Sequence, residues 1–370
     1  MRKFAPDMDY VRQTLQELLD IPSPAGFTDE AVRYTCHELE NLGIPYELTR
    51  RGGIRADLKG RIASPDRSIV AHLDTLGAMV SGLKENGRLS LTPIGTWSSR
   101  FAEGAHAWVY GDDAKFSGTI LPIKAAGHVY NEEIDQLPVS WDTVEFRVDH
   151  PASSARDLRE LGINVGDFVA VDPGTRMTDT GYICSRYLDD KAGVAVLLAA
   201  AREVVRRGIE LPMDCHLLFT ISEEVGSGAS AILHGDVAEM LTIDAGPAVP
   251  GQNADEFGVV VCMKDTTGPF DYHLTHKLLK LCAEHDIRHS RDVFRYYRCD
   301  SASAIEAGND IRTALVCFST DATHGFERCH ERSLVGLGEL LSVYMQADPT
   351  APGDAAALHS SIDEHPSLPV

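Results

Sequence analysis

Basic residues are scarce in this sequence. Its 370 residues include 34 Lys and Arg against 55 Asp and Glu, which gives a formal net charge of −21. Nucleic acids and anionic membrane surfaces are bound by basic faces, so this balance argues against both as partners. The excess of acidic residues is compatible with three roles: a solvated surface, attraction of cationic partners, or carboxylates that hold metal ions.

Long apolar segments are missing as well. The longest run, 192–201, has ten residues, whereas a membrane-spanning helix needs ~20. The first residues, MRKFAPDMDYVRQ, lack the apolar stretch of a signal peptide. The eight cysteines form no C-x-x-C pair and no dense framework, which is typical of reduced thiols in a chain of this length. We therefore expect a soluble cytoplasmic protein.

The chain nevertheless has enough apolar material for a large core. Hydrophobic residues make up 44% of it and charged residues 24%, as in soluble globular proteins. At ~150 residues per domain, the length predicts two domains, or one domain with an insertion. Residues 75–175 contain all three tryptophans and short alternating runs, which indicate an inserted β-rich domain. Residues 347–370 are rich in Pro, Ala, Asp and Ser and predict a disordered tail.

The remaining segments, 1–74 and 176–346, alternate predicted strands and helices. Apolar residues at helical spacing predict one helix that ends before Pro22 and a second over 28–42 that Gly43 stops. We expect further helices over 191–207 and 276–285, and strands over 69–73, 217–222, 240–243 and 314–320. This alternation is typical of an α/β domain whose sheet is flanked by helices.

Acidic and histidine residues gather at the ends of the predicted strands and at the start of one helix. The set comprises His72, Asp74, Asp189, Asp190, Glu223, Glu224, Asp244 and His324. Ligand sites of open α/β sheets lie at the carboxyl ends of the strands. Singly, each motif is also typical of a helix cap or a surface pair. However, adjacent carboxylates such as Glu223 and Glu224 repel each other at a buried strand end unless a cation or proton lies between them.

Taken together, these nitrogen and oxygen donors suit two divalent ions per subunit, Zn²⁺, Co²⁺ or Mn²⁺, ~3.5–4 Å apart with one bridging carboxylate. Such a pair activates a bridging water near neutral pH and polarises a carbonyl group. The reaction then needs one free carboxylate to take the proton of that water and pass it to the leaving amine. Adjacent glutamates fit this division, with one on the metal and the other as base.

Five motifs in order carry a family resemblance: AHLDTLGAMV, YLDDKAGVAVLL, ISEEVGSGAS, TIDAG and TDATHGFE. As a set they resemble the tetrahedral aminopeptidase family of di-metal peptidases, also called deblocking or glutamyl aminopeptidases and "cellulase M". The resemblance covers roughly residues 5–346. It implies a mixed sheet of the di-zinc exopeptidase type, and a dimerisation domain in 75–175 from which homo-oligomers of up to twelve subunits are built.

The resemblance also implies the metal ligands. His72, Asp189 and Asp244 would bind one metal, and Asp189 would bridge to a second metal held by Glu224 and His324. The family places its bridging ligand two residues before a basic position, here Lys191, which favours Asp189 over Asp190.

Two further residues receive roles by the same resemblance. Glu223 would be the general base, and Asp74 would orient the imidazole of His72. His330 lies six residues after His324 and stays open as a competing ligand. The neighbouring Glu327 and Arg328 are expected to form a local ion pair without a catalytic role.

The activity implied is removal of N-terminal residues from short peptides by a metallo-aminopeptidase. An alternative substrate is a capped dipeptide, because Gly308-Asn309-Asp310-Ile311-Arg312 and the segment from Thr323 to His330 resemble a bacterial subgroup associated with the osmoprotectant N-acetylglutaminylglutamine amide. A metal-dependent amidase or deacylase would then use the same ligands. A glycosidase is a remote alternative, because adjacent glutamates diverge and do not readily make the facing pair that glycoside cleavage needs.

Overall fold

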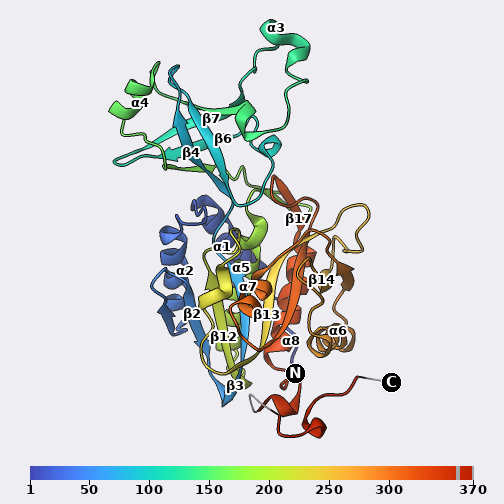
Figure 1. Cartoon of the computed structure of the whole chain (residues 1–370). Coiled ribbons are helices and arrows are strands. Elements are labelled where there is room, and N and C mark those ends of the chain that lie inside the picture. Colours follow the sequence, from blue (N-terminus) through green and yellow to red (C-terminus); the bar gives the residue numbers. More distant parts are fainter. Residues whose placement is uncertain (356–358, 369–370) are drawn as a thin grey trace.

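The computed structural model describes residues 1–355 and 359–368, and it divides into an α/β part and a smaller β part (Figure 1). The two parts meet where β3 (Gly60–His72), the blue strand at the centre of the large sheet, leads into β4 (Gly77–Leu83). No helix in the described residues is long and apolar enough to cross a membrane. All eight cysteines are free, as the sequence predicts.

The large sheet has eleven strands, in the order β1-β2-β12-β3-β13-β16-β17-β11-β10, with β14 against β16 and β15 against β14. Four neighbouring central strands, β12, β3, β13 and β16, run parallel, and the outer pairs are mostly antiparallel. The predicted mixed sheet is therefore confirmed. Besides β3, its strands are β1 (Tyr46–Leu48), β2 (Ile54–Leu58), β10 (Arg176–Met177), β11 (Tyr182–Ser185), β12 (Leu211–Thr220), β13 (Val237–Pro247), β14 (Val259–Lys264), β15 (His289–Val293), β16 (Arg312–Thr320) and β17 (Glu327–His330).

Helices cover both faces of this sheet. One face carries a single large apolar core built with α1 (Met8–Asp20), α2 (Asp29–Leu42), α5 (Leu188–Arg206), α6 (Tyr272–Glu284) and α8 (Glu331–Met345). The other face is covered by α7 (Asp300–Glu306) and the short 3₁₀ helix η4 (Gly228–Ala231). Gly43 ends α2 with φ of 69°, a left-handed conformation that glycine adopts without strain. The helices and strands predicted from periodicity are thus confirmed.

The β part is a closed barrel of six strands, in the order β4-β5-β8-β7-β6-β9. Its own apolar core contains residues such as Val109, Ile120 and Phe146, so the inserted segment is β-rich, as predicted. Trp97 and Trp141 pack edge to face beside it, with ring centroids 4.7 Å apart. The remaining elements of this part are β5 (Leu89–Ile94), η1 (Ser99–Phe101), β6 (His106–Tyr110), β7 (Lys115–Pro122), α3 (Gly127–Tyr130), η2 (Asn131–Glu133), η3 (Trp141–Thr143), β8 (Val144–Val148), α4 (Ala155–Glu160) and β9 (Phe168–Val171).

A buried ion pair connects the sheet to the end of α8. The guanidinium of Arg67, which has no exposed surface, donates to Glu239 Oε1 from Nε at 2.6 Å. Glu239 also accepts from the hydroxyl of Tyr344 at 3.2 Å and lies 3.3 Å from Lys277 Nζ. Burial would raise the pKa of Glu239, but the charges of Arg67 and Lys277 lower it to about 2.

The chain after α8 includes two short 3₁₀ turns, η5 (Pro352–Ala355) and η6 (Ile362–Glu364). Asp354 accepts from Arg312 Nε at 2.6 Å, which holds this part of the chain to β16. The predicted disordered tail, 347–370, includes 356–358 and 369–370, which lie outside the described residues.

Candidate metal centre

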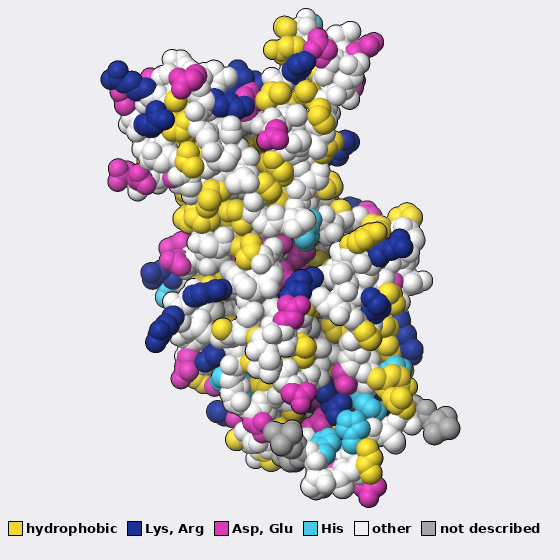
Figure 2. All heavy atoms as spheres, in the orientation of Figure 1, with side chains coloured by type: hydrophobic (Ala, Val, Ile, Leu, Met, Phe, Trp, Pro, Cys, Tyr) yellow, Lys and Arg dark blue, Asp and Glu magenta, His cyan; other side chains and the backbone are white. Residues whose placement is uncertain are grey.

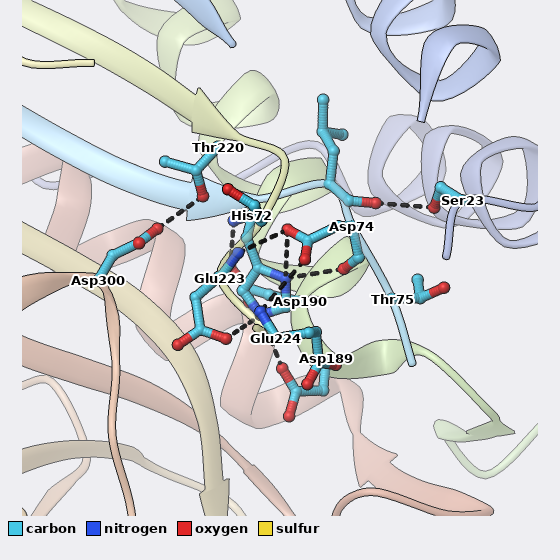
Figure 3. Close-up of polar contacts among 12 residues, drawn as sticks. Ser23, His72, Asp74, Thr75, Asp189, Asp190, Thr220, Glu223, Glu224 and Asp300 are labelled. Carbon is cyan, nitrogen blue, oxygen red and sulfur yellow. Dashed lines mark hydrogen bonds and ion pairs between the residues drawn. The ribbon is translucent and has the colours of Figure 1, made fainter. Parts of the chain in front are cut away.

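The motifs singled out in the sequence meet at the edge of the large sheet formed by the carboxyl ends of its central strands. Figure 3 shows the side chains that come from three of these motifs, among them His72, Asp189 and Glu223. His72 is the last residue of β3 and pairs in register with Thr220, the last residue of β12. Glu223 and Glu224 follow β12 directly, and Asp244 lies in the neighbouring β13. Because these strands are parallel, their carboxyl ends lie together, beside the barrel. Figure 2 shows acidic side chains and a histidine in the hollow where the two parts meet.

The first group of potential ligands consists of His72, Asp189 and Asp244. One donor atom from each lies within 4.8 Å of the other two, and all three residues are buried. His72 Nδ1 donates to the backbone carbonyl of Asp74 at 2.8 Å, which leaves Nε2 facing Asp189 Oδ1 at 3.0 Å. A histidine that is held at one nitrogen and turns the other toward a carboxylate of the same cluster has the arrangement of a metal ligand.

The second group consists of Asp189, Glu224 and His324. His324 Nε2 lies 3.7 Å from Asp189 Oδ2 and 3.8 Å from Glu224 Oε2. Its Nδ1 donates to the carbonyl of Thr96 at 2.7 Å. Thr96 lies between β5 and η1, so the barrel part holds this imidazole in place.

Asp189 lies between the two groups. Its Oδ1 faces His72 and its Oδ2 faces His324. The neighbouring Asp190 is also fully buried, but its Oδ2 accepts the backbone N–H of His72 at 3.2 Å. The side chain of His330 lies elsewhere, with Nε2 3.1 Å from the carbonyl of Thr180. Asp189 and His324 therefore lie where they could bind a pair of ions, with Asp189 between the two groups. Asp190 and His330 do not.

The electrostatics of this edge suit cations. Burial raises the pKa of Glu223, Glu224 and Asp244 well above the ordinary carboxylate range, and mutual repulsion raises it further. Burial would also raise the pKa of Asp189, but the hydrogen bond and charge of His72 lower it. Burial would lower the pKa of His72, yet Asp189 and the nearby carboxylates raise it well above its ordinary value. Bound cations would offset the repulsion among these carboxylates. A set of imidazole and carboxylate donors suits Zn²⁺, Co²⁺ or Mn²⁺.

Asp74 makes contacts that its sequence position does not predict. Its carboxylate, which has no exposed surface, accepts the backbone N–H of Glu223 at Oδ1 (3.0 Å) and that of Glu224 at Oδ2 (3.1 Å). The same Oδ1 is 3.8 Å from Nδ1 of His72, which instead bonds the carbonyl of Asp74. Burial raises the pKa of Asp74 to about 6. The residue therefore contacts His72 through its backbone and fixes the glutamate pair through its side chain.

Sequence reasoning missed Glu327. It is 1% exposed, and its carboxylate accepts the backbone N–H of Asp189 at 3.1 Å and that of His324 at 3.1 Å. The expected ion pair with Arg328 is wrong, because Arg328 bonds Glu256 and Asp321 instead. Glu327 is the first residue of β17, where alternation turns its side chain inward and that of Arg328 outward. Its position three residues after His324 was the available signal.

The barrel part also packs against the loop that carries His324. A Cβ added to Gly325 would lie 2.7 Å from the ring of Phe101 in η1, so a larger residue there would have to displace that ring. A narrow cleft beside the centre is lined from both parts, by Leu76, Trp97, Arg186, Tyr187, Asp189, Glu224, Gly325 and Glu327. The centre is therefore completed by both parts of the chain.

Comparisons with known proteins agree with this arrangement. The sequence profile of "M42 glutamyl aminopeptidase" matches residues 52–340. "Putative aminopeptidase YhfE" of Bacillus subtilis (strain 168) is 38% identical over 344 residues, which cover 92% of this chain and 99% of that protein. The "Glutamyl aminopeptidase" of Lactococcus lactis subsp. cremoris (strain MG1363) is 25% identical over 219 residues, 57% of this chain and 59% of that protein.

Solved structures share the fold. The TET aminopeptidase of a marine sediment archaeon, Thaumarchaeota archaeon SCGC AB-539-E09, superposes with a TM-score of 0.84 at 19% identity, covering 92% of this chain and 97% of that one. The TET1 peptidase of Pyrococcus horikoshii, which can assemble into a tetrahedron or a large octahedral shell, has a TM-score of 0.80 at 21% identity, covering 90% and 99%.

The fold, the buried donor set and these matches together define a class of enzyme, the metallo-aminopeptidases. Such enzymes hydrolyse a peptide bond next to the N-terminus of their substrate. This chain belongs to the M42 glutamyl aminopeptidase family.

Proposed function

We propose that this protein is a di-metal aminopeptidase that removes N-terminal residues from short peptides. The observation that carries the proposal is the position of Asp189, whose two oxygens face His72 and His324. His72, Asp189 and Asp244 would hold one ion, and Asp189, Glu224 and His324 the other. When bound, two Zn²⁺, Co²⁺ or Mn²⁺ ions would polarise the scissile carbonyl and make a water molecule more acidic.

Glu223 is placed to move the proton. Its Oε2 lies 3.9 Å from His72 Nε2, and its side chain is 12% exposed, so it borders the ligand cluster and is still reached by solvent. Burial raises the pKa of Glu223 well above its ordinary value, which makes it a better proton acceptor. Glu223 would take a proton from the attacking water and deliver it to the leaving amine as the C–N bond breaks. Asp74 keeps this side chain oriented by holding the Glu223 N–H.

Substitution of Glu223 tests the proposal. Glu223→Gln keeps the shape of the side chain and should retain both ions, while turnover falls by about 10²–10⁴, the usual contribution of a general base. Metal content and hydrolysis of aminoacyl p-nitroanilides would be measured on the same preparation. Glu132→Gln, an exposed change on the barrel part, is the matched control. Wild-type turnover in metal-loaded Glu223→Gln would refute the assignment.

The alternatives have less support. The relatives matched carry aminopeptidase names, and none of these comparisons favours an amidase that acts on a capped dipeptide. Glu223 and Glu224 turn toward His72 and His324 respectively, so they do not face each other as a glycosidase pair would. Comparing free-amine and N-acetylated dipeptides by liquid chromatography separates the peptidase from the amidase, since an aminopeptidase cleaves the free-amine substrate faster.

We further propose that the chain assembles into homo-oligomers through the barrel part. The P. horikoshii TET1 peptidase, which shares the fold, forms closed shells. Val129 at the end of the barrel part is 72% exposed, and Trp108 on β6 is also exposed; exposed apolar side chains of this kind are typical of interfaces. Light scattering after size exclusion should report a dimer or a multiple up to twelve subunits, and a monomer would contradict the proposal.

A further inference from the structure

A second cluster of histidine and carboxylate side chains lies away from the metal centre. Asp57 is in β2, His216 in β12, and His234 in the loop between η4 and β13. His216 is four residues before Thr220 in β12, the residue that pairs with His72. At ~3.3 Å per residue, the cluster is roughly 13 Å along the sheet from the centre. The proposed aminopeptidase mechanism uses none of these three side chains.

The three side chains converge on one point. Asp57 Oδ1 lies 2.6 Å from His216 Nδ1 and 3.2 Å from His234 Nε2. The two imidazole rings have centroids 4.2 Å apart, and one donor atom from each residue lies within 4.8 Å of the others. Two imidazoles and a carboxylate with a remaining open position are a donor set that Zn²⁺ accepts.

A fourth residue, Asp66, lies beside the nitrogen of His216 that faces away from Asp57. His216 Nε2, on the far side of the ring, lies 3.2 Å from Asp66 Oδ2. Asp66 is held by the backbone N–H of Asp236 at 2.8 Å. With Nδ1 on an ion, Nε2 would carry the proton and face this carboxylate, which is the carboxylate–histidine–metal arrangement of known zinc sites.

The cluster is incompletely satisfied by the protein alone. Within the part of the chain that the structure describes, His234 Nδ1 and Asp66 Oδ1 are buried without a hydrogen-bond partner, and His216 Nε2, although 3.2 Å from Asp66 Oδ2, is not aligned for a hydrogen bond. His216 is 4% exposed and Asp66 is 3% exposed, so water reaches neither freely. Buried polar atoms without partners cost free energy. A cation on His216 Nδ1 and His234 Nε2 would leave the ring proton of each imidazole on its other nitrogen, and His216 Nε2 would then face Asp66 as a donor.

The surrounding charges permit a cation. Arg55, the nearest guanidinium on β2, donates to the carbonyls of Ile232 and Leu233, and Lys59 pairs with Asp214.

We propose that Asp57, His216 and His234 form a third, structural zinc site, with Asp66 as the partner of His216. The ion would tie the loop between η4 and β13 to strands β2, β3 and β12. Asp57 and His234 are partly exposed, with 29% and 22% of their side-chain surface accessible, so the ion can enter from solvent and keep a water ligand. The site is distinct from the proposed catalytic ions and shares no residue with them.

Zinc stoichiometry in the full-length protein tests this proposal separately from the catalytic one. Each protein would be dialysed against micromolar zinc and analysed by mass spectrometry for metal per chain. Wild type and the control His128→Ala, an exposed histidine of α3, should bind the same amount, and His234→Ala one ion fewer. Asp189→Asn, which disrupts the catalytic centre, should still bind one ion, and this ion should disappear in Asp189→Asn/His234→Ala.

Equal zinc content in wild type and His234→Ala would overturn the third site, even if the catalytic ions are present. In case His234→Ala does not fold, crystals of the wild-type protein grown with zinc give an independent measurement. An anomalous peak at the zinc edge among Asp57, His216 and His234 supports the site. Occupied catalytic positions with no peak at this cluster would refute it.

Discussion

Asp74→Asn is the change that best separates positioning from ligation at the metal centre. The carboxylate accepts two backbone N–H groups, from Glu223 at 3.0 Å and Glu224 at 3.1 Å. Asparagine keeps one acceptor oxygen and turns an NH₂ group toward the other N–H. One hydrogen bond to a charged group is lost, which costs about 1.5–3 kcal/mol. If the whole of this free energy is lost from the stabilisation of the transition state, kcat/KM should fall about 10- to 150-fold.

Steady-state hydrolysis of an aminoacyl p-nitroanilide, metal content and thermal unfolding would be measured on the same preparation. Asp135→Asn, an exposed change of the same chemistry on the barrel part, is the control. We expect Asp74→Asn to lose kcat/KM while it keeps most of its metal, because His72 is held by the backbone carbonyl of residue 74. A kcat/KM within twofold of wild type would refute the positioning role. Loss of metal in parallel with activity would show instead that the Asp74 carboxylate is needed for the ligands to bind metal.

Two further changes test the bridge and the buried ion pair. Asp189→Asn should lose both catalytic ions together, because the two oxygens of Asp189 face different histidines; a catalytic ion that remains at its wild-type affinity would contradict the bridging role. Glu239→Gln should lower the free energy of unfolding at pH 7 by about 3 kcal/mol, because the pKa of Glu239 is about 2 against an ordinary value of 4.5. A lowered carboxylate pKa stabilises the fold above pH ~4.5 and loses that effect toward pH 2, so the difference should shrink by roughly 1 kcal/mol at pH 4. Urea denaturation at both pH values measures this, and a difference that grows at pH 4 would refute it.

The strands and the core of the centre could be predicted because their signals are local. An apolar run that ends in an acid or histidine identifies a strand and its functional end at once, as in β3 with His72 and β12 with Glu223 and Glu224. Parallel strands bring such ends together whatever their separation along the chain. Asp244 joined the set for the same reason, whereas Asp189 lies at the start of α5 and was found from its acidic motif before an apolar helix.

The parts that could not be predicted depend on backbone groups and on packing between distant segments. Thr96 holds His324 through a carbonyl oxygen, a group that every residue has and that leaves no trace in the sequence. Glu327 and Arg328 are adjacent in the sequence, but they have different partners because side chains alternate inward and outward along β17. The side chains of Asp57 and His216 are 159 positions apart, and only the pairing of β2 with β12 places them side by side.

The hydrogen bond from His324 to Thr96 has a consequence for when the enzyme becomes active. During synthesis His72 and the barrel leave the ribosome first, while His324 follows Thr96 by 228 residues. The last ligand thus docks onto a carbonyl of a part that can already have folded. A truncated chain that stops before His324 would contain His72, Asp189 and Asp244 but would lack one residue of the second group. Under the proposed two-ion mechanism, peptide cleavage would therefore begin only once the chain has been made through His324, so that shorter nascent chains would not act as peptidases.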